Sequence, residues 1–208
     1  MSSATPEIPR RLPRGTHGLD RDVVEASQRT RLLEAVGRAV AERGYAAATI
    51  DDVVGRAGVS KKTFYDHFAD KQDCFLAAYE AASEELLRRV AEAQATDLDW
   101  HERTRAGIAA YLRWLAGDPA LARVYLIEVA AAGPVALERR ERLRDRYAEL
   151  MLERGGPREL SAEIRHAVVA AADDVVVRHI RAHGAERLPE LEPVLLYLQT
   201  ALLGSSPP

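Results

Sequence analysis

The chain has 208 residues, of which 47% are hydrophobic and 29% charged, with a formal net charge of −3. This balance is ordinary for a globular protein that buries a core, and it excludes an intrinsically disordered chain. No apolar run approaches the length of a membrane-spanning helix, and the N-terminal residues lack the apolar centre of a secretory signal, so we expect a cytoplasmic protein that does not enter a membrane.

Residues 1–21 contain prolines and glycines but no hydrophobic period, which predicts a disordered tail. Arg10, Arg11 and Arg14 make this tail basic. A flexible basic arm can enter the minor groove of DNA when a DNA-reading element follows it. A solvated tail without a role is an equal alternative.

The first helix is predicted from Asp22 to Arg43, where apolar residues recur at helical spacing. Ala26, Leu33 and Val36 belong to its apolar side, and Gly44 is placed to end it. A helix of this length can brace the two shorter helices that the following residues predict.

Two short helices joined by a tight turn are predicted between residues 49 and 68. Thr49 is the expected N-cap of the first, because its hydroxyl can accept from a free backbone N–H. Gly58 can adopt the positive φ that ends a helix. Ser60 is the expected N-cap of the second, which continues to about Phe68.

The second short helix has one apolar and one polar side. Phe64 and Phe68 fall together and can pack against the first short helix. A short Gly-containing turn followed by a helix with a cationic and hydroxyl-rich face is typical of a helix-turn-helix. The polar face holds Lys62, Thr63, Tyr65 and Asp66, with Lys61 and His67 at its margins.

The order Thr-Ile-x-x-Val-x-x-x-Ala-Gly-Val-Ser-x-x-Thr-Phe-Tyr-x-His-Phe-x-Asp-Lys, from Thr49 to Lys71, resembles the DNA-binding signature of TetR-family transcriptional regulators. The match extends over about residues 28–76. The resemblance implies that Lys61 and Lys62 read bases or line the groove, that Thr63, Tyr65 and His67 contact phosphates or base edges, and that Thr49 and Lys71 contact the DNA backbone, with Ser60 also among the DNA-binding residues.

The charge near this signature is modest. From Arg10 to Lys71 there are twelve Lys and Arg against nine Asp and Glu, a difference of +3. Attraction to phosphate must therefore come from local placement and from pairing two such units. Asp66 could accept from cytosine N4, or it could repel wrong sites.

The remainder of the chain predicts six further helices, for about nine in all, with no convincing strand. A long helix after Lys71 would link two domains. The run after Asp118 and Pro119 is almost wholly apolar, as expected for one buried helix that ends at Gly133. We therefore expect an all-α protein with a helix-turn-helix domain at 22–71, a larger helical domain at 72–204 and a disordered tail at 205–208. The further helices are expected at about 72–95, 100–116, 119–132, 134–153, 161–182 and 189–203.

The segment 138–146, with the sequence ERRERLRDR, alternates charges of both signs over two turns. Its acids neutralise its bases locally, which favours a solvated face over a nucleic-acid patch.

The last two predicted helices carry broad faces of small and aliphatic residues. Such faces are expected to be covered by other apolar residues. A two-fold four-helix bundle, made by the last two helices of each of two subunits, would bury them. The family resemblance implies the same homodimer. The residues concerned are Ala167, Val168, Ala170, Ala171, Val175 and Val176, followed by Val194, Leu195, Leu198 and Leu202.

The resemblance also implies a small-molecule cavity in the larger domain. Its expected lining is Tyr111, Trp114, Tyr125, Glu128 and Val129, and ordinary core positions are an even alternative. An apolar cavity with one carboxylate would suit a hydrophobic or cationic ligand.

Signals for catalysis, cofactors or metals are absent or weak. The common nucleotide-binding, hydrolase and metalloprotease motifs do not occur, so we expect neither an enzyme nor a bound cofactor. His179 and His183 are spaced i, i+4, but the sequence places no third ligand beside them, so no metal site is predicted. Cys74 is the only cysteine and is expected in the core.

The predicted function is a ligand-responsive transcriptional regulator, a repressor that binds a palindromic operator as a homodimer and leaves it when a small molecule binds. The alternative is a helical protein-interaction module, or a regulator whose DNA-binding head is constitutive. The sequence specifies neither the operator nor the effector.

Overall fold

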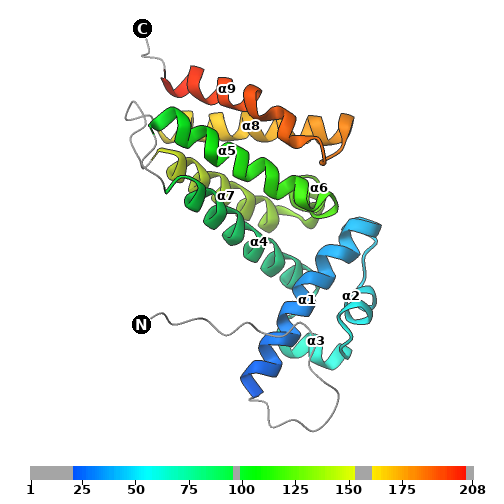
Figure 1. Cartoon of the computed structure of the whole chain (residues 1–208). Helices are drawn as coiled ribbons and strands as arrows, with labels where there is room; N and C mark the ends of the chain where they lie inside the picture. Colours follow the sequence, from blue (N-terminus) through cyan, green and yellow to red (C-terminus); the bar gives the residue numbers. More distant parts are fainter. Residues whose placement is uncertain (1–20, 96–98, 153–160, 205–208) are drawn as a thin grey trace, which may run out of the picture. The chain divides into compact units, whose positions relative to one another are not determined.

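The computed structural model describes residues 21–95, 99–152 and 161–204 (Figure 1). Every regular element in those ranges is helical, which confirms the all-α prediction, and none of these helices is both long and apolar enough to cross a bilayer. The predicted tails at 1–20 and 205–208 lie outside the described residues, while Arg21 already belongs to the first helix. The elements are α1 (Arg21–Arg43), α2 (Ile50–Ala57), α3 (Lys61–His67), α4 (Lys71–Ala93), α5 (Trp100–Gly117), α6 (Pro119–Leu126), the 3-10 helix η1 (Glu128–Ala132), α7 (Pro134–Leu152), α8 (Ala162–His183), the 3-10 helix η2 (Leu188–Leu191) and α9 (Glu192–Gly204).

The chain forms two compact units that meet in sequence between Ala78 and Tyr79. The first contains α1 to α3 and the first two turns of α4, and the second contains everything after them. Helix α4 therefore belongs to both units.

The first unit buries one face of each of its helices. Leu32, Val36, Val53 and Phe64 are fully buried. Val36 of α1 is buried as predicted, but the buried leucine is Leu32, whereas the predicted Leu33 is only half-buried. Leu32 and Leu33 are both apolar and adjacent, and the sequence alone did not distinguish which of them is the more deeply buried.

Cys74 lies in the core of the first unit, as predicted, with Sγ 3.8 Å from the carbonyl oxygen of Leu32. Burial raises the pKa of its thiol to about 12.

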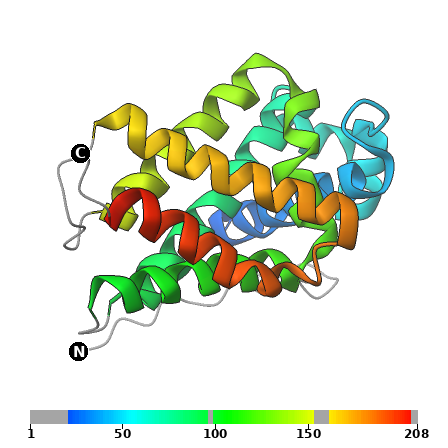
Figure 2. The same ribbon diagram turned by 90° about the horizontal axis from the view of Figure 1, so that it is seen from above.

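The second unit is a helical bundle built around α5. Helix α5 packs against η2 and α9, while α7 packs against α8, and α8 and α9 lie side by side in both ribbon views (Figure 2). Ile108, Leu112 and Leu115 form the α5 side of the core. Val176 of α8 and Leu195 of α9 pack into the same cluster.

The single helix predicted after Asp118 is broken in the structure. Its start is as predicted, since Asp118 accepts from Leu121 N at 3.2 Å and Pro119 occupies the first turn. Helix α6 nevertheless ends at Leu126, and η1 follows. A 3-10 helix repeats every three residues, so Val129 and Ala132 share its buried face.

Substitutions at the two glycines of α2 and its turn should have opposite effects on stability. Gly58 has φ 63° and ψ 40°, a left-handed conformation that costs an L-residue about 1 kcal/mol. Gly55 lies inside α2 with open space beside it. We expect Gly58→Ala to lower the free energy of unfolding by about 1 kcal/mol, and Gly55→Ala to raise it by about 0.5–1 kcal/mol. Urea denaturation followed by circular dichroism measures both, and a loss of stability in both variants would contradict the assignment of the turn.

Candidate nucleic-acid interface and ligand cavity

The helix-turn-helix is held by reciprocal hydrogen bonds at its caps. Thr49 Oγ1 accepts from Asp52 N at 3.2 Å, and the Asp52 carboxylate accepts from Thr49 N at 2.9 Å, which forms a capping box. The hydrogen bond from the Thr49 side chain is the main cause that lowers the pKa of Asp52. Ser60 Oγ accepts from Thr63 N at 3.0 Å, so both predicted N-caps are confirmed.

The polar face of α3 is exposed as the helical spacing predicts. Phe64 and Phe68 are buried, whereas Lys62 and Tyr65 are exposed. Tyr65 has 56% of its surface accessible. Thr63 and His67 are half-buried at the margins of this face.

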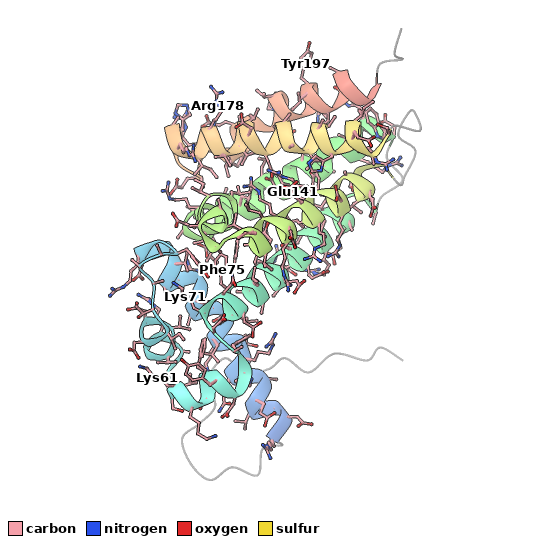
Figure 3. The ribbon with its side chains drawn as sticks, turned by 180° about the vertical axis from the view of Figure 1, so that it is seen from behind. Lys61, Lys71, Phe75, Glu141, Arg178 and Tyr197 are labelled. Atoms are coloured by element: carbon pink, nitrogen blue, oxygen red, sulfur yellow. The ribbon has the colours of Figure 1, made fainter. Side chains whose placement is uncertain are left out.

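Both lysines of α3 are paired with carboxylates in the free protein. Lys61 Nζ lies 2.7 Å from Asp51 of α2, and this hydrogen bond raises the pKa of Lys61 (Figure 3). Lys62 Nζ lies 3.2 Å from Asp66 one turn later. Each lysine is therefore matched by one carboxylate, so the face is not a plain cationic patch.

Lys71 is engaged inside the first unit. Its Nζ donates to the carbonyl oxygens of Tyr45 at 2.7 Å and Ala48 at 2.8 Å, and lies 4.4 Å from the centre of the Tyr45 ring. These contacts fix the first turn of α4 against the segment between α1 and α2. A contact from Lys71 to the DNA backbone stays a prediction, which its third N–H could make.

His67 is also tied to the scaffold. Its Nε2 lies 3.4 Å from Oε1 of Gln28, and the neighbouring Phe68 ring is covered by the Arg29 guanidinium at 4.7 Å. These contacts position the C-terminal end of α3 against α1. A role for His67 toward DNA is untested by them and stays a prediction.

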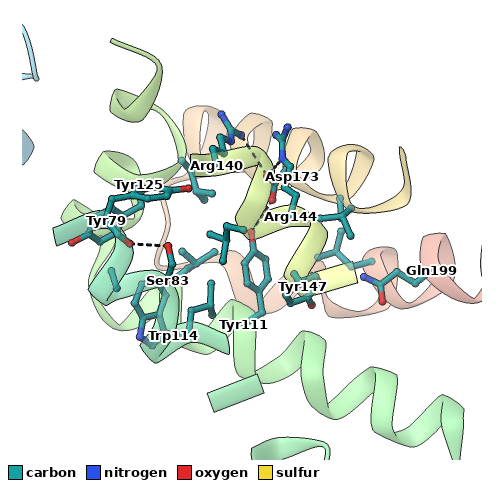
Figure 4. A pocket seen from close by; sticks show the side chains of 18 residues that line it. Tyr79, Ser83, Tyr111, Trp114, Tyr125, Arg140, Arg144, Tyr147, Asp173 and Gln199 are labelled. Atoms are coloured by element: carbon teal, nitrogen blue, oxygen red, sulfur yellow. Dashed lines mark hydrogen bonds and ion pairs between the residues drawn. The ribbon is translucent and has the colours of Figure 1, made fainter. Parts of the chain in front are cut away.

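The second unit contains an apolar cavity of about 60 Å³ (Figure 4). Aromatic rings form much of its wall: Tyr79 and Tyr125 meet at 5.8 Å between centroids, and Trp114 stacks on Tyr125 at 6.4 Å. The volume would hold about two water molecules, whereas ligand sites usually measure about 300–1,000 Å³. A ligand would therefore have to widen the cavity. The lining residues are Tyr79, Ala82, Ser83, Leu86, Tyr111, Trp114, Leu115, Tyr125, Leu126, Arg140, Leu143, Arg144, Tyr147, Val169, Ala172, Asp173, Leu195 and Gln199.

One wall of the cavity is charged. Asp173 of α8 accepts from Arg144 Nε at 2.8 Å and from the Tyr111 hydroxyl at 3.3 Å, and its Oδ2 lies 3.4 Å from Arg140 Nη2 (Figure 4). Burial, followed by the charge of Asp173, raises the pKa of Tyr111. A buried carboxylate is thus held by two guanidiniums and a phenol.

The structure brings together part of the predicted ligand site. Tyr111, Trp114 and Tyr125 line the cavity. Glu128 and Val129 do not line it, because they belong to η1, where Val129 is turned into the core. The carboxylate at this cavity is Asp173, and it is accompanied by Arg140 and Arg144. The cavity therefore differs from the predicted apolar cavity with a single carboxylate.

Sequence reasoning missed Arg140 and Arg144 by treating 138–146 as a solvated face. Arg142 of that segment is exposed, but Arg140 and Arg144 are largely buried and point inward. Their spacing of i, i+4, in phase with Tyr147, was the available signal.

The histidine pair does not extend into a metal site. The rings of His179 and His183 lie 4.8 Å apart, and no group of three metal-ligating side chains occurs within the described ranges.

Comparison with solved structures supports the fold. A fatty acid degradation regulator, FadR, from Bacillus halodurans superposes with a TM-score of 0.72 at 21% identity, over 86% of this chain and 99% of that one. FadR from Bacillus subtilis, solved in complex with stearoyl-CoA, gives 0.69 at 19% identity, over 86% and 99%. At this level of identity, the similarity shows the shared fold.

Comparison of sequences finds relatives that match less than half of this chain. The HTH-type transcriptional activator FasR of Mycolicibacterium smegmatis is 35% identical over 91 residues, which are 44% of this chain and 42% of that protein. The uncharacterized HTH-type regulator YhgD of Bacillus subtilis is 30% identical over 83 residues, 40% of this chain and 44% of that one. The match thus spans less than half of these relatives.

The profile of the family described as "Bacterial regulatory proteins, tetR family" matches residues 32–78. These residues contain most of α1, all of α2 and α3 and the start of α4, which is the unit whose capped turn and exposed polar face were described above. Through residues 32–78 the chain thus resembles the bacterial regulatory proteins of the tetR family.

Proposed function

We propose that the chain is a ligand-responsive transcriptional regulator that binds an operator as a homodimer, and that a small molecule in the cavity of the second unit releases it. The palindromic operator follows from two-fold symmetry, with half-sites about a helical turn or more apart. The observation that carries the proposal is that α4 supplies residues to both the DNA-binding unit and the cavity.

The two ends of this part of α4 have different contacts. Lys71 and Cys74 reach backbone carbonyls of the first unit, and the Phe75 ring packs edge-on against Tyr45 at 5.0 Å. Tyr79 and Ser83, one and two turns later, line the cavity. A ligand that widens the cavity must displace these side chains or the helix that carries them. A continuous helix transmits such a displacement to the DNA-binding unit.

The homodimer is proposed on the outer faces of α8 and α9. Tyr197 is 76% exposed, and Ile164 and Val194 are about half exposed (Figure 3). The predicted faces are divided in the structure: Val168, Val176 and Leu195 are buried within the protomer, whereas Ala167, Ala171, Val175, Val194 and Leu198 remain wholly or partly accessible. The accessible residues would form the contact with a second copy.

We propose that the bound protein represses transcription, so that its release by a ligand allows transcription to start. Activation is a second candidate, because the relative FasR is described as an activator. A third candidate is a regulator whose DNA-binding unit is constitutive and whose second unit binds another protein. A reporter fused to the DNA upstream of the protein's own gene distinguishes a repressor from an activator. A gel shift with and without a cell-metabolite extract distinguishes these two from a constitutive regulator.

Filling the cavity should abolish the response to ligand while DNA binding persists. Ala82 lines the cavity, whereas its neighbour Ala81 is exposed on the same helix. We expect Ala82→Leu to bind the upstream DNA normally but to resist release by the extract, and Ala81→Leu to behave as wild type. Fluorescence anisotropy measures both. A normal response of Ala82→Leu would contradict the assignment of the cavity.

Lys62 and Lys71 should affect DNA binding differently. Lys62 has 85% of its side chain exposed on the reading face, so Lys62→Ala should remove about 1–3 kcal/mol of discrimination at one base pair. Lys71→Ala should weaken all sequences alike and flatten the salt slope by about one unit. Selection from random duplexes and salt titrations measure these effects, with thermal melts to separate any loss of fold. Equal losses on specific and random DNA in both variants refute this division.

Two exposed tyrosines should separate dimerisation from DNA binding. Tyr197 is on α9 and Tyr65 is on α3, and both are exposed. Tyr197→Glu should give a monomer, because it places a charge in an apolar contact. Tyr65→Glu should keep the dimer and lose DNA affinity. Sedimentation velocity distinguishes the two, and a Tyr197→Glu dimer would place the interface elsewhere.

A further inference from the structure

The charged wall of the cavity carries more positive than negative groups. Three of the lining residues are charged: Arg140, Arg144 and Asp173. Glu141 also contacts Arg144, at 2.7 Å, but it is partly exposed and does not line the cavity. The wall that a ligand would meet therefore holds two guanidiniums and one carboxylate.

Of the two arginines, Arg140 has the weaker contacts to carboxylates. Arg144 has close contacts to Asp173 at 2.8 Å and to Glu141 at 2.7 Å, whereas Arg140 reaches Asp173 only at 3.4 Å. Arg140 Nε is buried and has no hydrogen-bond partner among the residues that the structure describes. A buried donor on a cation is costly when unpaired, so an acceptor at this position would be stabilising.

Apart from Ser83, Gln199 and the tyrosine hydroxyls, the rest of the wall is apolar. Leu86, Leu115 and Leu143 come from three different helices, and Val169 and Leu195 from two more. These side chains can contact the aliphatic or aromatic part of a ligand, and none of them carries a charge.

We propose that the cavity binds an amphiphile with an oxyanion, carboxylate or phosphate, which accepts hydrogen bonds from Arg140 while its apolar body lies among the leucines and aromatic rings. This inference rests on the proposed function, because it gives the chemical class of the effector at the same site. Arg144 balances the charge of Asp173, and the Tyr111 hydroxyl donates a hydrogen bond to it, so Arg140 selects for the charge of the ligand.

Trp114 provides a direct readout. It lines the cavity, and Trp100 is the other tryptophan of the chain. In a Trp100→Phe background, the fluorescence of Trp114 would report entry of a ligand without any DNA present. Four soluble probes share a ten-carbon chain: decanoate, decan-1-ol, decylammonium and decanoyl-CoA.

The expected order is set by charge. Decanoate should bind at least about tenfold more tightly than decan-1-ol, and decylammonium should bind most weakly. Arg140→Gln should weaken decanoate about tenfold and leave decan-1-ol unchanged, which also shows that the cavity is still folded. Arg142→Gln, an exposed neighbour on α7, should change neither affinity.

Decanoyl-CoA distinguishes the sources of the oxyanion. Binding that falls about tenfold in Arg140→Gln supports the proposal with a phosphate as the anion, and binding that ignores Arg140 overturns it. The proposal also fails if decan-1-ol or decylammonium equals decanoate, or if no probe binds. Binding of decanoate without any change in DNA affinity would refute the proposed function and leave this inference standing.

Discussion

The Lys71 ammonium, which bonds to the carbonyl oxygens of Tyr45 and Ala48, fixes where α4 begins. Charge-assisted bonds of this kind are stronger than neutral ones, and these two close loops of 26 and 23 residues. Cys74 and Phe75 extend the same attachment along the next turn. The proposed response to a ligand depends on this end of α4 being held firmly, while Tyr79 and Ser83, later on the same helix, line the cavity.

The charges on both functional surfaces are arranged in pairs. On the reading face, Lys61 and Lys62 are held by Asp51 and Asp66, and DNA would have to compete with these exposed pairs. Exposed ion pairs are worth at most about 1 kcal/mol, so phosphate or a base edge can replace them at little cost. In the proposed complex the carboxylates would remain at the surface and oppose DNA sites that offer no donor, so we expect the pairs to affect selectivity. In the cavity, removing a partner of Asp173 would destabilise the protein more strongly, because it would leave a largely buried charge without its partner.

The sequence predicted the helices and the reading head well, because caps and turns are local. Thr49, Gly58 and Ser60 act through neighbours within four residues, so their roles could be predicted without the fold. The burial of Leu32 rather than Leu33 could not be predicted, since the two leucines differ only in what packs against them. The break at Ile127 and the inward turn of Arg140 depend likewise on distant residues. Asp173 lies 33 positions from Arg140, and nothing in the local charge pattern indicated that pair.

The burial of Cys74 has a consequence for the kinds of signal that this protein can sense. A thiol reacts with oxidants as the thiolate, and with a pKa of about 12 almost none is present at neutral pH. The sulfur is also covered by the core that holds α4 to α1. Direct oxidation of the DNA-binding unit is therefore disfavoured for as long as that unit stays folded.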